Sequence, residues 1–340
     1  ARHGSSCEVA DYFDLAGIRA SGAMTSREPA DGNAPRGRSR SPEARRAAGV
    51  STTGEEAGAQ QAPRLMFLLA GQSNMAGRGP LTELCATLGG ADDPRVAVLG
   101  PDGRWQVPAR HPLHNDKPDK VGVGPGLAFA HAVVDFLPAD SQHVGLLPCA
   151  VGGSPLERCM SPNGDLLAVA RSQLAAGRAA GGHLAGILWH QGESDCSCEA
   201  DSSSYASRLR RALQGLREAS GELDVPVVLG ELGVHFLDQV GDPRFRHAAR
   251  VNCAIAEVAA GDARAALASA HGLAHKGDRL HFSSSAADEL GRRYAWKWLR
   301  LTGRAHGSLR LLLGSSLEPP LLSESGRDQA FDGCRGENVP

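Results

Sequence analysis

Between residues 64 and 301 the chain alternates short apolar runs with longer amphipathic segments, and this alternation limits the fold more than any other feature. Apolar runs of about four to eight residues are typical of buried strands, whereas longer segments with a period near 3.6 residues are typical of helices. Strands that alternate with helices form a parallel sheet covered by helices on both faces. The expected strands are residues 65–70, 144–149, 184–189, 225–232 and 263–268. The expected helices are residues 126–137, 165–180, 203–220, 243–260 and 285–301.

The segments on either side of this pattern have a different character. Residues 1–63 are rich in Gly, Ala, Ser and Arg and contain few large apolar side chains, so we expect a disordered extension without a secretory signal. Residues 64–304 form the predicted domain, and residues 305–340 form a loosely ordered tail. Within the domain, residues 78–125 are rich in Pro, Gly and His, and we expect this insertion to arch over the sheet edge as part of a binding wall.

The composition argues against nucleic-acid and membrane partners. Hydrophobic residues make up 41% of the chain, which allows a sizeable core, and the formal net charge is −2. A chain so close to neutrality lacks the basic surface that nucleic acids and anionic membranes attract. No apolar stretch reaches the roughly 18 residues that a membrane-spanning helix needs.

The eight cysteines are scattered and do not predict a metal site or a disulfide framework. Cys196 and Cys198 lie close to His190 in the sequence, but this set lacks a fourth ligand at a useful spacing, so we expect no metal. Cys85 and Cys159 could pair in an oxidising compartment.

Small and hydrogen-bonding residues follow several of the predicted strands, where ligands bind in parallel α/β sheets. Four sequence blocks carry them: "GQSN" at 71–74, "AVGGSPLE" at 150–157, "HQGESD" at 190–195 and "KGDRLHFS" at 276–283. Because the carboxyl ends of parallel strands share one edge of the sheet, these four blocks predict a single site.

The residues of these blocks indicate acyl transfer. A serine hydroxyl such as that of Ser73 needs a base within hydrogen-bond reach, and His281 is the candidate base. Asp278, three residues earlier, can orient the other ring nitrogen. The Ser73 and Gly153 backbone N–H groups, with the Gln191 side-chain amide, are candidate donors to an oxyanion.

Each block also has a structural explanation. Ser73 or Asn74 could cap a helix, and the two glycines of "GGS" could form an ordinary tight turn. Glu193 could be favoured by a helix dipole, and Asp278 could pair with a neighbouring basic residue in a solvated loop. The G-x-S-x-G elbow of α/β-hydrolases does not fit, because Met75 stands where that motif has glycine. The agreement of four blocks on one edge favours the catalytic interpretation.

Four ordered motifs resemble the SGNH-hydrolase superfamily. They are "GQSNMAG" at 71–77, "PCAVGGSPL" at 148–156, "WHQGESD" at 189–195 and "DRLHFS" at 278–283, together with "VGVGPGLAFA" at 121–130. Within that superfamily they resemble most closely the sialate O-acetylesterase-like carbohydrate esterases, in the branch that includes plant proteins and acetylxylan esterases. The resemblance implies an α/β fold, a three-layer α/β/α sandwich with a mostly five-stranded parallel sheet. It also implies removal of O-acetyl groups from sugars without a cofactor.

The resemblance also implies roles for individual residues. Ser73 would be the nucleophile, His281 the general base and Asp278 its orienting acid. Gly153 would supply an oxyanion N–H, and Gln191 would stand where the wider superfamily has Asn. Side chains that could contact substrate or support the site are Gln72, Asn74, Arg78 and Glu193. Pro155 departs from the usual pattern after the glycines, but it removes no catalytic group.

Two other functions remain open from the sequence. The same edge could bind a carbohydrate without turnover, using the amides and Arg78 for sugar hydroxyls. The scaffold could also serve a lipid or thioester hydrolase, although the sequence shows no particular apolar groove. The expected partner is an acetylated carbohydrate; the particular sugar, the compartment and the oligomeric state do not follow from the sequence.

Overall fold

The computed structural model of the chain describes residues 65–84, 92–137, 143–160, 164–237 and 241–304. Contacts divide the chain into residues 1–60 and 61–340, and all the described residues belong to the second unit. The expected extension at 1–63, the tail at 305–340 and the Cys85 half of the possible disulfide lie outside the described residues.

The described part is an α/β domain whose sheet has seven strands in the order β3-β2-β4-β1-β5-β6-β7. The strands are β1 (Leu65–Gly71), β2 (Val96–Leu99), β3 (Trp105–Gln106), β4 (Val144–Ala150), β5 (His183–His190), β6 (Val227–Gly230) and β7 (Ala265–Ala268). Six strands are parallel, and the two-residue β3 pairs antiparallel with β2. The five predicted strands correspond to β1, β4, β5, β6 and β7.

The sheet is two strands larger than expected, and both additional strands come from the insertion at 78–125. The run Val96–Leu99 forms β2, whose first three residues pair with β4 from Val144 to Leu146. This segment therefore extends the sheet as well as supplying loops, which corrects the expectation of five strands. The run was missed because it lies in a segment rich in Pro and Gly that otherwise favours turns.

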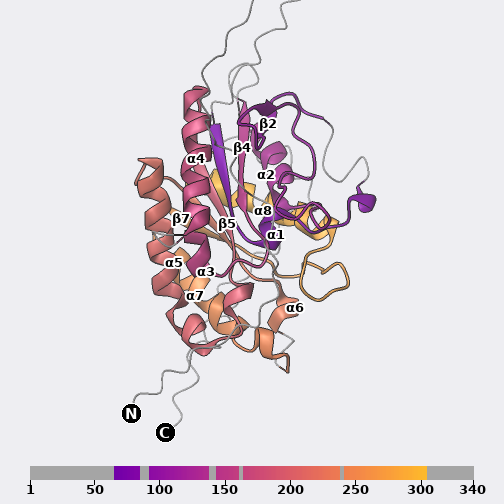
Figure 1. Cartoon of the computed structure of the whole chain (residues 1–340), viewed down its shortest axis with the longest axis vertical. Coiled ribbons are helices and arrows are strands. Elements are labelled where there is room, and N and C mark those ends of the chain that lie inside the picture. Colours follow the sequence, from indigo (N-terminus) through magenta and orange to yellow (C-terminus); the bar gives the residue numbers. More distant parts are fainter. Residues whose placement is uncertain (1–64, 85–91, 138–142, 161–163, 238–240, 305–340) are drawn as a thin grey trace, which may run out of the picture. The chain divides into compact units, whose positions relative to one another are not determined.

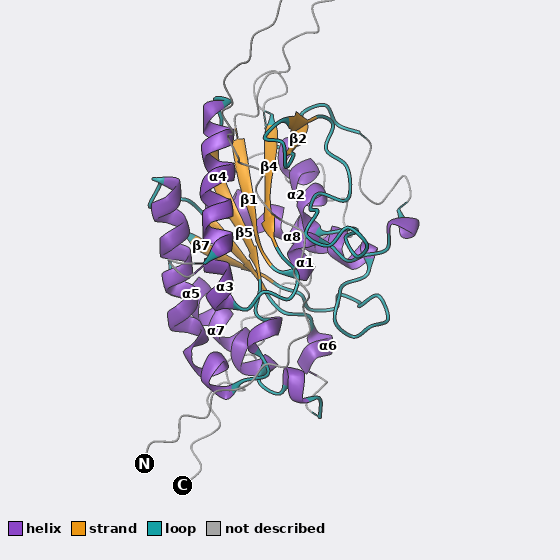
Figure 2. Cartoon of the chain, in the orientation of Figure 1, coloured by secondary structure: helices purple, strands orange, loops and turns teal. Residues whose placement is uncertain are grey.

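Helices cover both faces of the sheet (Figure 1, Figure 2). The helices are α1 (Ser73–Ala76), α2 (Pro125–Val134), α3 (Leu156–Met160), α4 (Asp165–Ala179), α5 (Glu199–Ser220), α6 (Val234–Leu237), α7 (Ala248–Ala260) and α8 (Ser284–Leu301). Short 3-10 turns are η1 (Leu81–Glu83), η2 (Glu193–Asp195) and η3 (Pro243–Phe245). In Figure 1, α2 and α8 lie on one side of the strands, with α4, α5 and α7 on the other. No helix in the described ranges is long and apolar enough to cross a membrane.

The central strand β1 divides the core into two layers. Successive side chains of a strand point to opposite faces, so Met66 and Leu68 pack with α4, α5 and α7. Phe67 and Leu69 pack with α2 and α8. The Phe67 ring makes an edge contact with Trp298 of α8, with 5.0 Å between centroids. Burial on both faces explains why the sequence of β1 is continuously apolar.

The strand order positions the site. Strands β2, β3 and β4 lie on one side of β1, and β5, β6 and β7 lie on the other, so the strand order reverses at β1. The carboxyl ends of parallel strands at such a reversal form a crevice where ligands bind. The four sequence blocks follow β1, β4, β5 and β7, so all of them reach this edge.

Candidate active site

The turn after β1 brings Ser73 to the carboxyl edge of the sheet. Gly71 has φ 134°, and a Cβ at this position would lie 2.0 Å from the His190 carbonyl oxygen, so the close approach of β1 to β5 requires glycine. The Gln72 N–H donates to the same carbonyl at 2.9 Å. Ser73 is the first residue of α1 and keeps 6% of its surface exposed. The turn therefore presents the hydroxyl at the edge of the sheet.

Three of the predicted residues, 208 positions apart at their extremes, meet in one hydrogen-bonded chain. The His281 Nε2 lies 3.1 Å from the Ser73 Oγ, and its Nδ1 lies 2.7 Å from the Asp278 Oδ2. The carboxylate folds back onto its own loop, because Asp278 Oδ1 accepts the backbone N–H groups of Leu280 and His281 at 2.9 and 2.8 Å. An ionised Asp278 accepts a hydrogen bond from Nδ1–H, which leaves Nε2 free to accept the serine proton.

The electrostatics of this chain favour a neutral histidine. Burial lowers the pKa of His281 below its usual value, although the neighbouring Asp278 works in the opposite direction. Burial alone would raise the pKa of Asp278, but hydrogen bonds from His281 and the Leu280 N–H outweigh it and lower the pKa to about 2. At neutral pH the site therefore holds a carboxylate beside an unprotonated imidazole, which is the state that a general base requires.

Two backbone donors lie unpaired at the same edge. Gly153, in the turn after β4, has φ 78°, a conformation that favours glycine. Within the described part of the chain, the backbone N–H groups of Ser73 and Gly153 donate to no acceptor. Unpaired N–H groups at such an edge are suited to stabilise a developing oxyanion.

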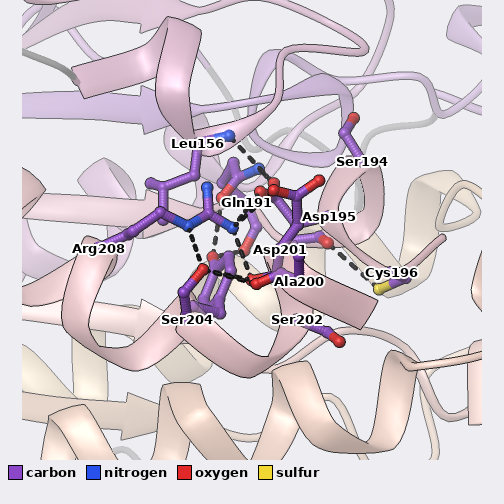
Figure 3. Close-up of polar contacts among 12 residues, drawn as sticks. Leu156, Gln191, Ser194, Asp195, Cys196, Ala200, Asp201, Ser202, Ser204 and Arg208 are labelled. Atoms are coloured by element: carbon purple, nitrogen blue, oxygen red, sulfur yellow. Dashed lines mark hydrogen bonds and ion pairs between the residues drawn. The ribbon is translucent and has the colours of Figure 1, made fainter. Parts of the chain in front are cut away.

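Gln191, the third expected oxyanion donor, has a different set of contacts (Figure 3). Its side chain is buried, and Nε2 donates to Asp195 Oδ2 at 2.6 Å, to Ser154 O at 3.2 Å and to Gln72 Oε1 at 3.3 Å. The Tyr205 hydroxyl donates to its Oε1 at 2.8 Å. An amide has two N–H bonds, so an oxyanion could gain a donor here only by replacing one of these acceptors.

Asp195 anchors this group of contacts. Besides Gln191, it accepts the Leu156 N–H at 3.0 Å and the Arg208 Nη2 at 2.8 Å (Figure 3). Gln72, in the turn after β1, belongs to the same group of contacts, since its Oε1 also accepts the Ser194 N–H at 3.3 Å. These side chains hold the turns after β1, β4 and β5 together.

Asn74 and Glu193 link the turn that carries Ser73, after β1, to the loop that carries His281. Asn74 Nδ2 donates to Glu193 Oε1 at 2.5 Å and to Leu280 O at 3.3 Å, and Asn74 Oδ1 accepts the Phe282 N–H at 3.2 Å. Leu280 and Phe282 flank His281, so Asn74 holds the loop on both sides of this histidine. Glu193 is hydrogen-bonded to Asn74, whereas the carboxylate hydrogen-bonded to the His281 ring is that of Asp278.

Sequence reasoning missed His190 and Tyr294. His190 lies next to Glu193, and Tyr294 lies next to His190. The Tyr294 hydroxyl donates to Trp189 O at 2.7 Å and lies 3.2 Å from His190 Nδ1. The His190 Nε2 lies 3.6 Å from Glu193 Oε1. Burial raises the pKa of Glu193, but the His190 ring and the Asn74 amide outweigh it, so the pKa is lowered and Glu193 stays ionised. The position of His190 at the end of a predicted strand was the available sequence signal.

Arg78 does not face open solvent as a sugar-binding side chain would. Its side chain is 4% exposed, and the guanidinium forms an ion pair with Asp116 from the insertion, at 2.6 Å between Nη2 and Oδ2. Sequence reasoning did not single out Asp116, which stands among polar residues without any periodic pattern.

Cys196 and Cys198 follow η2 and lie just before the start of α5. The Cys196 thiol is buried and donates to Gly192 O at 3.2 Å, and Cys198 is the residue immediately before α5. Among the residues that the structure describes, no group of three His, Cys, Asp or Glu side chains could hold a metal ion.

Comparisons with known proteins show the family of the chain. The family model "Carbohydrate esterase, sialic acid-specific acetylesterase" matches residues 63–300. An Arabidopsis thaliana protein named a probable carbohydrate esterase is 32% identical over 256 residues, which cover 70% of this chain and 91% of that protein. An X-ray structure of an Arabidopsis thaliana protein, 29% identical, superposes with a TM-score of 0.63 over 70% of this chain and 98% of that one. The family expected from the four motifs is thereby confirmed: the chain belongs to the sialic acid-specific acetylesterase family of carbohydrate esterases and is a carboxylic ester hydrolase.

Proposed function

We propose that the chain removes O-acetyl groups from carbohydrates through an acetyl-enzyme formed on Ser73. The observation that carries the proposal is the hydrogen-bonded chain from Ser73 Oγ through His281 to Asp278, at 3.1 and 2.7 Å. The family match supports the ester substrate and its carbohydrate part. The N–H groups of Ser73 and Gly153, which donate to no acceptor among the described residues and follow the adjacent strands β1 and β4, support the acyl-transfer chemistry.

In the first half-reaction, His281 Nε2 takes the Ser73 proton as Oγ attacks the acetyl carbonyl carbon. The carbonyl oxygen becomes an oxyanion that accepts hydrogen bonds from the Ser73 and Gly153 N–H groups. His281 then donates its proton to the sugar oxygen as the bond between that oxygen and the acetyl carbon breaks. The deacetylated sugar leaves, and the acetyl group remains on Ser73.

In the second half-reaction, His281 takes a proton from water as the water oxygen attacks the acetyl carbon. The tetrahedral intermediate again places its oxyanion at the two N–H groups. Its collapse breaks the bond to Ser73 Oγ, which recovers the proton from His281, and acetate leaves. Asp278 remains ionised throughout and stabilises the imidazolium that forms in each half-reaction. In this scheme Gln191 holds the three turns in place and does not contact the substrate.

The proposal is tested by ester hydrolysis with the full chain, comparing wild type with Ser73→Ala. We expect kcat to fall at least about a thousandfold, because removal of a serine nucleophile leaves only the background catalysis of the site. The control is Ser207→Ala, the same substitution on the exposed surface of α5, which should leave kcat unchanged. Hydrolysis of p-nitrophenyl acetate by a folded Ser73→Ala variant at the wild-type rate would contradict the assignment.

The acyl group separates the proposal from a lipid or thioester hydrolase. We expect a higher kcat/KM for acetyl than for octanoyl esters of the same alcohol, and a long-chain preference would favour the lipid alternative. Binding of several acetylated sugars without release of acetate would favour a carbohydrate-binding protein.

A further inference from the structure

A buried ion pair joins the segment just after α1 to the loop that carries Gly153. The Arg78 guanidinium contacts Asp116 twice, at 2.6 Å from Nη2 to Oδ2 and 3.3 Å from Nη1 to Oδ1. The two side chains are 4% and 2% exposed. We propose that Asp116, held by Arg78, is a positioning residue that aims the Gly153 N–H at the oxyanion. This inference rests on the proposed function.

The link from Asp116 to the loop is direct. Its Oδ2 accepts the Gly152 N–H at 2.7 Å, one residue before the proposed oxyanion donor. A Cβ on Gly152 would lie 2.3 Å from Arg78 Nη2 and 3.2 Å from Asp116 Oδ2, so the pair fits closely against the glycine backbone. The Gly153 nitrogen belongs to the peptide plane that starts at Gly152, so holding Gly152 restricts the direction of the next N–H.

The link from Arg78 reaches the nucleophile. Arg78 Nη1 donates to Gly77 O at 2.7 Å, and the Gly77 N–H donates to Ser73 O at 2.9 Å at the end of α1. The pair therefore contacts the segments that carry both proposed oxyanion donors, Ser73 and Gly153. Ion pairs buried this deeply contribute little to stability when compared with apolar side chains of the same shape. Their hydrogen bonds instead fix the relative position of the two turns.

The expected effect follows from the geometry of an oxyanion hole. Donors act when they lie about 2.7–3.1 Å from the oxyanion, and displacement by about 1 Å costs roughly a hundredfold in rate. Asp116→Asn removes the charge and replaces one carboxylate oxygen with an NH2 group, which cannot accept from the guanidinium as the second oxygen does, so Arg78 no longer holds the side chain at two points. We expect kcat for an acetyl ester to fall about ten- to a hundredfold, with KM changed less than about threefold.

The matched control is Asp262→Asn. Asp262 is also paired with a partly buried arginine, at 2.6 Å from Arg217 Nη1, and also accepts a backbone N–H, that of Arg264 at 2.8 Å. It lies just before β7, at the amino edge of the sheet and away from the site. This variant loses the same kind of contacts, so we expect lower stability with kcat unchanged.

A second readout separates positioning from general loosening of the site. An alkylboronic acid forms a tetrahedral adduct with a serine nucleophile and places a boron-bound oxygen where the oxyanion would lie. We expect its inhibition constant to rise in Asp116→Asn by the same factor as kcat/KM falls, while Asp262→Asn leaves it unchanged. Asp116→Glu keeps the charge but lengthens the side chain, and we expect an intermediate loss of kcat.

The outcomes distinguish this inference from the proposed function. If wild type hydrolyses acetyl esters through Ser73, but a folded Asp116→Asn or Asp116→Glu enzyme keeps kcat within about threefold of wild type, the positioning role is wrong. If neither variant folds, the pair is a folding determinant and the positioning role is rejected. If wild type shows no Ser73-dependent hydrolysis, the proposed function itself fails.

Discussion

Replacing Asn74 with alanine should weaken both the fold and the catalytic base. The side chain makes three hydrogen bonds, to Glu193 Oε1, Leu280 O and the Phe282 N–H. Alanine removes all three and leaves the Glu193 carboxylate and the Phe282 N–H buried without these partners. Each unpaired buried group costs about 1–3 kcal/mol, and a charged group costs more. We therefore expect the free energy of unfolding to fall by about 3–5 kcal/mol.

Activity should fall in the same variant because Leu280 and Phe282 flank His281. Without Asn74 the loop loses its attachment to α1, so the His281 Nε2 no longer stays within hydrogen-bond distance of Ser73 Oγ. We expect kcat for an acetyl ester to drop about ten- to a hundredfold, since a small misplacement of a catalytic group has effects of this size.

Asn74→Asp provides a matched comparison. Its carboxylate can still accept the Phe282 N–H, but it faces Glu193 at the position where Asn74 Nδ2 lies 2.5 Å from Oε1. Two carboxylates this close cannot both ionise, so one pKa rises above its unfolded value. The folded state then binds more protons than the unfolded state, and the stability deficit should shrink as the pH falls from 7 towards about 4. Asn74→Ala also removes a donor that lowers the pKa of Glu193, so its stability deficit should shrink in the same direction, but by less than that of Asn74→Asp.

Urea unfolding followed by circular dichroism, with kcat measured on the same preparations, tests this reasoning. The unfolding midpoint should fall with the slope unchanged, because the exposed surface on unfolding is nearly the same. A midpoint equal to that of wild type, together with kcat within about threefold, would refute the role of Asn74.

Three other perturbations test separate parts of the account. Because the pKa of His281 is lowered, kcat/KM should fall on the acid side only below the usual histidine pKa. Asp278→Asn removes a group that raises this pKa, so the acid-side fall of kcat/KM should move to lower pH, and the maximum of kcat/KM should decrease. His281→Ala should decrease that maximum further. His114 is buried and neutral in the fold, because burial lowers its pKa to about 4. The free energy of unfolding should therefore fall by about 2 kcal/mol between pH 7 and 5, as the pH passes below about 6.5. His114→Leu should remove this part of the pH dependence of stability, measured by urea unfolding. Gly71→Ala places a Cβ 2.0 Å from the His190 carbonyl, so its melting temperature should fall sharply, and an unchanged value would contradict the required close approach.

The central strands could be predicted because their burial on both faces leaves a continuous apolar run. β1, β4 and β5 fall within one or two residues of the expected ranges. β2 could not be predicted, because its four residues lie in a segment dominated by turn-forming residues and gain their strand conformation from pairing with β4. Pairing of this kind depends on tertiary context, which local propensity does not contain.

The site was predictable at the level of residue type and strand end. Ser73 and His281 were expected to meet because parallel strands place their carboxyl ends together, and the structure brings them to 3.1 Å. The partners of buried polar side chains were not predictable. Whether Arg78 would meet a sugar or Asp116, and whether Gln191 would face the oxyanion or Asp195, depends on side-chain directions within irregular loops.

Acetate release from a natural type of substrate shows whether Ser73 carries the acetyl group of a carbohydrate ester. The full chain and its Ser73→Ala variant would each be incubated with an O-acetylated oligosaccharide, and free acetate would be quantified over time. If Ser73 is the nucleophile, we expect steady release by the wild type and at least about a thousandfold slower release by the folded variant. Equal release by both would contradict it.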